Sequence, residues 1–521
     1  MVFEPTIGLM NPLILDGQPL ALAEIEAVSL SARPVAIAPA ALARIAASRA
    51  RIEQILAADQ TVYGVNTGFG RLSDLRVPHE SLERLQTNLV RSHAGGVGQP
   101  LSEAEVRAML LLRANVLAKG FSGCRAELVE LLASLLNAGV HPVIPEKGSV
   151  GASGDLAPLA HLALVVIGEG EALYKSERLT GGEALRRAGL RPLNLAAKEG
   201  LALLNGTQAM TAVGALALAR SRRVARLADL AGAMSLEALM GTPAAFDPRI
   251  HAVRPHLGQI AAAQHLMRLM EDSEIREAHR ERDSRVQDAY CLRCMPQVHG
   301  AVRDVLDHVA GVLHVESGSA TDNPLVFPQP SSETSDRGAV LSGGNFHGAP
   351  LAYAFDYAAI ALADLAGIAE RRIDRLLNPD INEQLPAFLS SDAGLSSGFM
   401  MAQIVAAALI SECQVLAHPS SAGNIPTSGG KEDHVSMGMT GALKLRQIVE
   451  NVERIVGIEL MCAAQGVEFR LPLRPSREIG RACAAVRAVV PRLEQDRTLT
   501  PDIDAMAAAV RTGAFSAWCQ E

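Results

Sequence analysis

The chain has 521 residues, of which 49% are hydrophobic and 20% are charged, and its formal net charge is -8. This composition is typical of a globular protein with a large buried core and excludes a disordered chain. Acidic residues number 56 and basic residues 48, and the basic residues form no run. We therefore expect neither a nucleic acid nor a membrane surface as partner.

The N-terminal segment Met1–Pro5 does not lead from a basic stretch into an apolar one. We therefore expect no signal or transit peptide and a cytoplasmic location. The most apolar windows, Leu156–Ile167 and Leu201–Leu218, contain polar residues and fall short of the roughly 20 residues that span a bilayer. Seven cysteines, an odd number, predict reduced thiols.

Ala and Leu recur at three- and four-residue spacing while aromatic residues make up only 3%, which predicts a mainly α protein. Five long segments are apolar on more than one face, which is typical of helices inside a bundle or at a subunit interface. These segments are Ala104–Ala118, Ala126–Asn137, Ala209–Met240, Ala349–Leu376 and Ser397–Leu416. We place a boundary near residue 200, between a smaller mixed part (1–200) and a long-helix bundle with the C-terminal helices (201–521).

Gly-rich loops lie between these helices, and such loops are where we expect a functional site. In Gly148–Pro158, Asp155 is expected to cap a helix and Pro158 to lie in its first turn. Ala152-Ser153-Gly154 then forms a tight turn, although such a triplet alone arises by chance about once in a chain this rich in Ala and Gly. A hydrolase elbow, G-x-S-x-G, fails because Asp155 occupies its fifth position.

A tight Ala-Ser-Gly turn also permits a covalent change. The Gly154 nitrogen can attack the Ala152 carbonyl, and loss of two waters, one of them carrying the Ser153 hydroxyl, leaves a methylidene-imidazolone ring. Such a ring is an electrophile built from the chain itself.

Around this turn, Lys147–His161 resembles the aromatic amino acid ammonia-lyases. Six other blocks resemble that family in the same order along the chain: Tyr63–Gly70, Ser92–Gly98, Leu203–Gln208, Gln287–Cys294, Gly343–His347 and Glu432–Met437. The resemblance implies a helical bundle of the ammonia-lyase and fumarase-like type, and a methylidene-imidazolone formed from Ala152, Ser153 and Gly154. It also implies ammonia elimination from an α-amino acid, and a homotetramer whose active sites are shared between subunits.

The resemblance assigns roles to two tyrosines. Tyr63 is the base that removes the β-proton, and Tyr290 assists at the electrophile and the leaving amine. A phenol with its ordinary pKa near ~10 is a poor base unless positive charge or a helix N-terminus lowers that pKa. On the residues alone, both are equally well core tyrosines with satisfied hydroxyls.

Four further residues are candidates for binding. Arg293 suits a substrate carboxylate because its planar fork makes paired hydrogen bonds, although a structural ion pair is its commoner role. Gln287 is a substrate-binding candidate in the same block. Asn205 lies in an apolar stretch and needs a polar partner, which in the family is found near the ring and the substrate; otherwise it is a helix-packing residue. Phe346 is expected against the ring or substrate, but alone is a core Phe.

Three other patterns do not define a cofactor site. Cys291-Leu292-Arg293-Cys294 lacks a second C-x-x-C pair, and Gly95–Gly98 lacks the ending of a phosphate loop. The run Glu432-Asp433-His434 suits one loop better than one coordination sphere. We expect no metal and no nucleotide.

The substrate side chain is inferred from His93 and Glu432. A histidine and a carboxylate supply donor and acceptor for an imidazole, which favours L-histidine as substrate and trans-urocanate as product. Alternatively, His93 makes a structural hydrogen bond and Glu432 is a solvated loop charge. A tyrosine- or phenylalanine-specific lyase, or an aminomutase, would use nearly the same residues.

The chain departs from the family pattern at Gly318, Cys291 and Gly429-Gly430-Lys431. Lys431 places a positive charge beside the expected imidazole pocket, where it would pair with Glu432 or alter substrate preference. Two hypotheses of other classes also remain: a serine hydrolase that uses Ser153, and a non-catalytic helical scaffold.

Overall fold

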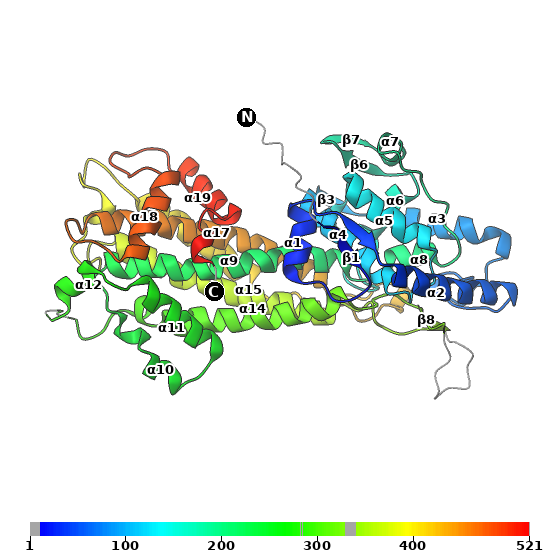
Figure 1. Cartoon of the computed structure of the whole chain (residues 1–521), viewed down its shortest axis with the longest axis horizontal. Helices are drawn as coiled ribbons and strands as arrows, with labels where there is room; N and C mark the ends of the chain where they lie inside the picture. Colours follow the sequence, from blue (N-terminus) through cyan, green and yellow to red (C-terminus); the bar gives the residue numbers. More distant parts are fainter. Residues whose placement is uncertain (1–10, 282, 284, 329–339, 520–521) are drawn as a thin grey trace. The chain divides into compact units, whose positions relative to one another are not determined.

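The computed structural model describes residues 11–281, 283, 285–328 and 340–519. Over these ranges the chain forms nineteen α-helices and only short strands (Figure 1). This confirms the mainly α fold class. The five long helices expected from the sequence are present as α4 (Glu103–Ala118), α5 (Ala126–Ala138), α9 (Gln208–Ala238), α15 (Ala349–Leu377) and α16 (Met400–Leu416).

The chain divides into two compact units. Unit 1 comprises Met1–Leu216, Ala310–Phe355 and Ser420–Leu443, and unit 2 comprises Ala217–Val309, Asp356–Pro419 and Lys444–Glu521. Four of the five boundaries fall within helices, namely α9, α14 (Met295–Ser317), α15 and α17 (Gly438–Glu468), and the fifth lies between Pro419 and Ser420, in the segment that joins α16 to α17. The division predicted near residue 200 stays a prediction, and the compact units take segments from both sides of it.

Unit 1 contains most of the shorter N-terminal helices. They are α1 (Leu22–Leu30), α2 (Pro39–Ala57), α3 (Leu82–His93), α4, α5, α6 (Leu156–Val166), α7 (Gly181–Arg187) and α8 (Glu199–Leu204), with 3-10 turns at Gly70–Leu72, His79–Ser81 and Ser428–Gly430. Helix α4 begins at a capping box, in which Ser102 and Glu105 each accept a hydrogen bond from the other's backbone N–H. Its side chains are buried from Glu105 to Ala118, and it packs against α1 and α5, so it is the core helix of this unit.

The strands of unit 1 form four small sheets. Strands β1 (Leu13–Leu15) and β2 (Val35–Ile37) pair in parallel; β3 (Val97–Pro100) pairs antiparallel with β5 (Pro145–Lys147), and β8 (Leu325–Val326) with β9 (Val340–Leu341). An antiparallel sheet in the order β4 (Val140–Pro142), β6 (Glu171–Tyr174), β7 (Glu177–Thr180) places Val140 opposite Tyr174. Strands β1 to β7 lie within residues 1–200, whereas β8 and β9 come from a later part of the chain.

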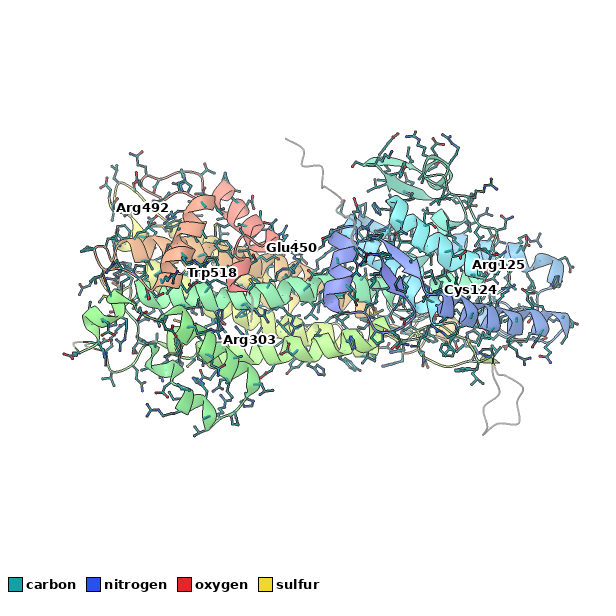
Figure 2. All side chains as sticks on the ribbon, in the orientation of Figure 1. Cys124, Arg125, Arg303, Glu450, Arg492 and Trp518 are labelled. Carbon is teal, nitrogen blue, oxygen red and sulfur yellow. The ribbon has the colours of Figure 1, made fainter. Side chains whose placement is uncertain are left out.

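Unit 2 is helical. Besides its parts of the long helices it contains α10 (Pro248–Ala252), α11 (Leu257–Leu269), α12 (Glu274–His279), α13 (Tyr290–Arg293), α16, α18 (Arg477–Val489) and α19 (Thr500–Thr512), with 3-10 turns at Pro243–Phe246, Ala387–Leu389 and Ser516–Trp518. An ion pair between Arg372 and Glu459 is fully buried in its core. Trp518, labelled in Figure 2, lies near the C-terminus. Its indole N–H donates a hydrogen bond to the carboxylate of Glu478 on α18.

Helix α15 is long and apolar enough to cross a membrane by length and composition, which the sequence analysis did not anticipate. Its most apolar window is 61% buried inside the structure. Burial of that extent is typical of a core helix in a soluble protein.

Candidate active site

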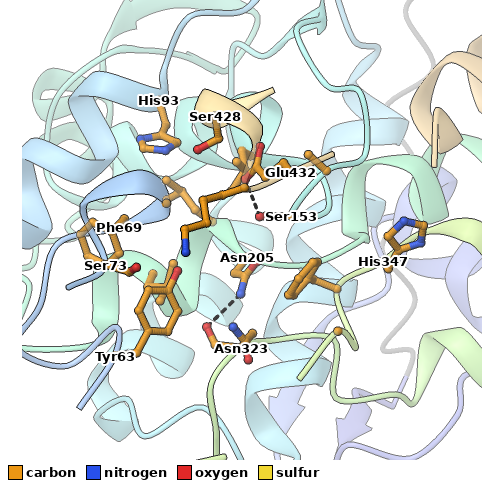
Figure 3. Close-up of a pocket in the computed structure, with 18 of the residues that line it drawn as sticks. Tyr63, Phe69, Ser73, His93, Ser153, Asn205, Asn323, His347, Ser428 and Glu432 are labelled. Atoms are coloured by element: carbon orange, nitrogen blue, oxygen red, sulfur yellow. Dashed lines mark hydrogen bonds between the residues drawn. The ribbon is translucent and has the colours of Figure 1, made fainter. Parts of the chain in front are cut away.

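A cavity of about 600 Å³ lies in unit 1. Seven of the eleven predicted site residues line it: Tyr63, His93, Ala152, Ser153, Asn205, Phe346 and Glu432. Their side chains come from loops and helix ends that are distant in sequence and meet around one space (Figure 3). Gly154 does not line the cavity itself but follows Ser153, which does. The other three predicted residues, Gln287, Tyr290 and Arg293, belong to unit 2 and do not line it.

The Ala152–Gly154 turn is tightly constrained. Gly154 has a φ of +77°, and a Cβ there would lie 2.1 Å from the Gly206 carbonyl oxygen, so only glycine fits. The same carbonyl accepts a hydrogen bond from the Asp155 N–H at 2.7 Å. The turn is therefore pinned against the residue that follows Asn205.

The carboxylate of Asp155 does not play the expected role. Helix α6 begins at Leu156, with Pro158 in its first turn as predicted, but the Asp155 side chain makes no capping hydrogen bond. It accepts instead from the Ser149 hydroxyl at 3.0 Å and from the Met210 N–H at 2.8 Å, at the start of α9. Burial raises the pKa of Asp155 to about 7. The capping prediction was wrong because the free N–H groups of a second helix compete for the carboxylate.

Both oxygens of Glu432 accept hydrogen bonds. The Ser153 hydroxyl donates to Oε1 at 2.9 Å, as Figure 3 shows, and the Thr427 hydroxyl donates to Oε2 at 2.7 Å. Glu432 is therefore fixed beside the turn and is not a solvated loop charge. Thr427 carried no signal in the sequence.

Asn205 follows the last residue of α8 and is only 3% exposed. Its amide nitrogen donates to the Asn323 carbonyl at 2.9 Å (Figure 3), but its Oδ1 has no hydrogen-bond partner. A buried acceptor without a partner is costly, so this oxygen is suited to receive a donor from a bound molecule. Asn323 belongs to a run typical of the family, Thr321–Pro324, but was not among the predicted site residues.

Tyr63 is half-buried, and its surroundings raise the pKa of its phenol. Burial is the largest cause; the charges of Glu432 and Asp322 act in the same direction, and a hydrogen bond from the Gly70 backbone opposes them. From the sequence, a base at this position was expected to have its pKa lowered by positive charge or by a helix N-terminus, and the structure gives the opposite shift. Among the described side chains that line the cavity, Lys431 is the only lysine or arginine.

Two histidine-bearing segments shape the rest of the cavity wall. The Nδ1 of His93 lies 2.9 Å from the Leu89 carbonyl, and donation to that carbonyl leaves Nε2 as an acceptor in the neutral ring. His347 accepts from the Ala349 N–H and its Nε2 contacts the His434 carbonyl at 3.2 Å, with the two rings stacked 5.9 Å apart. The loop that carries Phe346 is thereby tied to the loop that carries Glu432.

The three remaining predicted residues lie in unit 2. The Arg293 guanidinium stacks over the Tyr290 ring at 4.6 Å, and Tyr290 is 71% exposed. Tyr290 lines a second cavity of about 660 Å³ together with Cys291 and Cys294, while Gln287 is exposed. The structure thus brings Tyr290 and Arg293 together, but not to the cavity in unit 1.

The residues of the cavity fit a methylidene-imidazolone. The glycine-only turn provides the bend, and Ser153 carries the hydroxyl that must leave. Asn205, which lines the same cavity, has a buried amide oxygen that lacks a hydrogen-bond donor. Across the part of the chain that the structure describes, no three His, Cys, Asp or Glu side chains are grouped so as to hold a metal ion.

Comparison with known proteins places the chain in a family. The model of the family "Aromatic amino acid lyase" matches residues 20–488. The chain is 55% identical to a histidine ammonia-lyase of Koribacter versatilis (strain Ellin345) over 513 residues, 98% of this chain and 99% of the relative. It is equally identical to one of Anaeromyxobacter sp. (strain K), over 97% and 99% of the two chains.

Solved structures of the same family have the same fold as this chain. The crystal structure of histidine ammonia-lyase from Trypanosoma cruzi superposes with a TM-score of 0.89 at 46% identity, covering 98% of this chain and 95% of that one. Tyrosine aminomutase from Streptomyces globisporus superposes with a TM-score of 0.91 at 38% identity, covering 97% and 98%. The chain belongs to the aromatic amino acid lyase family and is an enzyme, a carbon–nitrogen lyase.

Proposed function

We propose that the chain eliminates ammonia from L-histidine and releases trans-urocanate. The observation that carries this proposal is the 55% identity to histidine ammonia-lyases over nearly the whole chain. The cavity in unit 1 supports it, because Tyr63, Ser153, Asn205 and Glu432 line one space. The substrate supplies an imidazole, an ammonium and a carboxylate, and each needs a partner there.

Ala152, Ser153 and Gly154 form the methylidene-imidazolone in this proposal. That group supplies the electrophile that makes the substrate's amine a better leaving group. Elimination is difficult because the β-proton is far less acidic than the α-ammonium, so a base alone deprotonates the wrong atom.

The side chains of unit 1 take the remaining tasks. Tyr63 removes the β-proton, which its phenolate form does and its phenol form does not. The free Oδ1 of Asn205 accepts a hydrogen bond from the substrate's amino group. Glu432 and the Nε2 of His93 hold the imidazole, and Phe346 packs against the bound molecule.

In this proposal, a second copy of the chain contributes three residues to the active site: Gln287, Tyr290 and Arg293. Arg293 clamps the substrate carboxylate, and its guanidinium stacks over the Tyr290 ring, so the two side chains act from the same place. We propose a homotetramer with shared active sites. Helix α15 supports it, since Tyr353, Tyr357 and Ile360, spaced four and three residues apart, are 48 to 60% exposed and leave large apolar side chains on one face of the helix. The protein is soluble, and we place it in the cytoplasm.

A second candidate substrate is tyrosine. A tyrosine aminomutase shares the fold at 38% identity, and Lys431 lines the cavity where a phenol would lie. An ammonium group stabilises a phenolate and repels an imidazolium. Lys431 is therefore the residue that would shift preference from histidine to tyrosine.

Two measurements test the proposal. The intact mass is expected to fall short of the sequence mass by two waters, with the deficit confined to the tryptic peptide that carries Ala152–Gly154. A full mass in active protein would overturn it, and is what a serine hydrolase or a silent scaffold would give. Histidine, tyrosine and phenylalanine are then offered separately, and the ultraviolet absorbance of the conjugated acid is followed. Faster turnover of tyrosine or phenylalanine would refute histidine as the substrate.

A further inference from the structure

Arg113 is a fully buried cation without a hydrogen-bonded carboxylate partner. It lies on α4 and its side chain is 0% exposed. Its guanidinium donates to three uncharged oxygens: the carbonyl of Asn205 at 2.9 Å, the amide oxygen of Gln208 at 2.5 Å, and the carbonyl of Ala202. Burial lowers the pKa of Arg113 to about 10, so the group stays charged at neutral pH.

These three oxygens mark the junction between two helices. Helix α8 ends at Leu204, and the last carbonyls of a helix have no N–H partner in a following turn. A cation at this end also interacts favourably with the helix dipole. Since Gln208 is the first residue of α9, one planar fork holds the end of α8 and the start of α9 together.

The junction carries the parts of the site that need exact placement. Asn205 is held by Arg113 through its backbone carbonyl and by Asn323 through its amide nitrogen, which leaves Oδ1 as its unpartnered atom. The next residue, Gly206, accepts from the Asp155 N–H and bridges to Gly154. A Cβ on Gly206 would lie 2.5 Å from Nη1 of Arg113, so the guanidinium packs directly against the residue that pins the turn.

We propose that Arg113 is a positioning residue for both ring formation and elimination. Its guanidinium sets the Asn205 side chain and the Gly206 carbonyl, and through that carbonyl the Ala152–Gly154 turn. Arg113 does not line the cavity, so it acts through these residues and touches no substrate. The inference rests on the proposed function and adds to it a residue that lies outside every family block.

Arg107 provides a matched control on the same helix. It is 4% exposed, and its guanidinium donates to the Val28 and Leu136 carbonyls and contacts His141, none of which lines the cavity. Arg113→Lys and Arg107→Lys each replace a planar fork by a compact ammonium in a buried setting. A merely structural role for Arg113 predicts that the two variants behave alike.

Each full-length variant is measured in three ways: thermal unfolding, the fraction of chains that lack two waters by intact mass, and kcat and KM per dehydrated chain with histidine. We expect both variants to lose stability. Only Arg113→Lys is expected to lower the dehydrated fraction, and its kcat per dehydrated chain is expected to fall about 10- to 100-fold, because a misplacement of about 1 Å costs on the order of 10²-fold. Its KM should change by less than about threefold.

Gln208→Met is a second variant, which removes one Arg113 partner and keeps the side-chain length. It is expected to shift the dehydrated fraction and kcat in the same direction by a smaller factor, and it carries the test if Arg113→Lys does not fold. The inference is overturned if Arg113→Lys and Gln208→Met keep the wild-type dehydrated fraction and kcat. It is also overturned if Arg107→Lys loses as much of both as Arg113→Lys does. Failure of the unmodified chain to release ammonia from histidine overturns the proposed function instead, while the dehydrated fraction still reports on Arg113.

Discussion

Replacing Glu432 by glutamine tests how the imidazole is recognised. The carboxylate accepts two hydroxyl hydrogen bonds, at 2.9 Å from Ser153 and 2.7 Å from Thr427. Dehydration of Ser153 removes the first donor and leaves Oε1 for the imidazole N–H. A hydrogen bond to a charged group contributes about 1.5 to 3 kcal/mol. Since about 1.4 kcal/mol is a factor of ten, kcat/KM for histidine is expected to fall about 10- to 150-fold in Glu432→Gln.

The assay is the initial rate of urocanate absorbance, run with Glu432→Gln and with Asp433→Asn. The second variant removes the neighbouring charge, which also lies at the cavity wall but is exposed to solvent, and we expect it to change kcat/KM by less than about threefold because solvent screens an exposed charge. Intact mass confirms that the ring has formed in both. If Glu432→Gln stays within threefold of the unmodified chain, or if Asp433→Asn loses as much, the assignment of Glu432 to the imidazole is refuted.

Two further predictions concern Tyr63 and a buried ion pair. Because the pKa of Tyr63 is raised, its phenol keeps its proton to higher pH, and kcat/KM for histidine should rise with pH into the alkaline range. Tyr63→Phe has no base at this position, so it should be inactive at every pH while it keeps the mass deficit of two waters. A flat profile from neutral to alkaline pH would contradict Tyr63 as the base. Lys198 and Asp322 form an ion pair at 2.8 Å, and both side chains are fully buried. Asp322→Asn should therefore lower the free energy of unfolding, measured in urea, by about 3 to 5 kcal/mol. Glu171→Gln, in the exposed pair with Arg178, should lower it by about 0 to 1 kcal/mol. Equal losses would show that burial of the pair does not matter.

Local pattern was sufficient to predict the main helices, and the family resemblance grouped seven of the residues that line the cavity. The expected helix Ala126–Asn137 agrees with α5 to within one residue. The Ala and Leu spacing is followed by Gly139, which adopts a left-handed conformation and ends the helix. The blocks around Tyr63, Ser153 and Asn205 meet in space, as their resemblance implied.

Properties set by partners distant in sequence were not predictable. The cap expected of Asp155 failed because Met210, 55 residues away, supplies the nearer N–H. The pKa of Tyr63 moves upward because burial and the charge of Asp322 act on it, and neither is visible in its own segment. Arg113 gave no signal, since an arginine within an apolar helix is equally compatible with a surface position.

Two chain segments lie against the Ala152–Gly154 turn, residues 150–151 and residues 436–437, and the ribosome makes them at very different times. Val150 and Gly151 accept hydrogen bonds from the Met437 N–H and the Ser436 hydroxyl, and the second of these bonds joins residues 285 positions apart. A ribosome adding about 5 to 20 residues per second needs roughly 14 to 57 s to cover that interval. Until residues 436 and 437 have been made, Ala152–Gly154 lacks these two contacts, so a ring closure that depends on them takes place only near the end of translation.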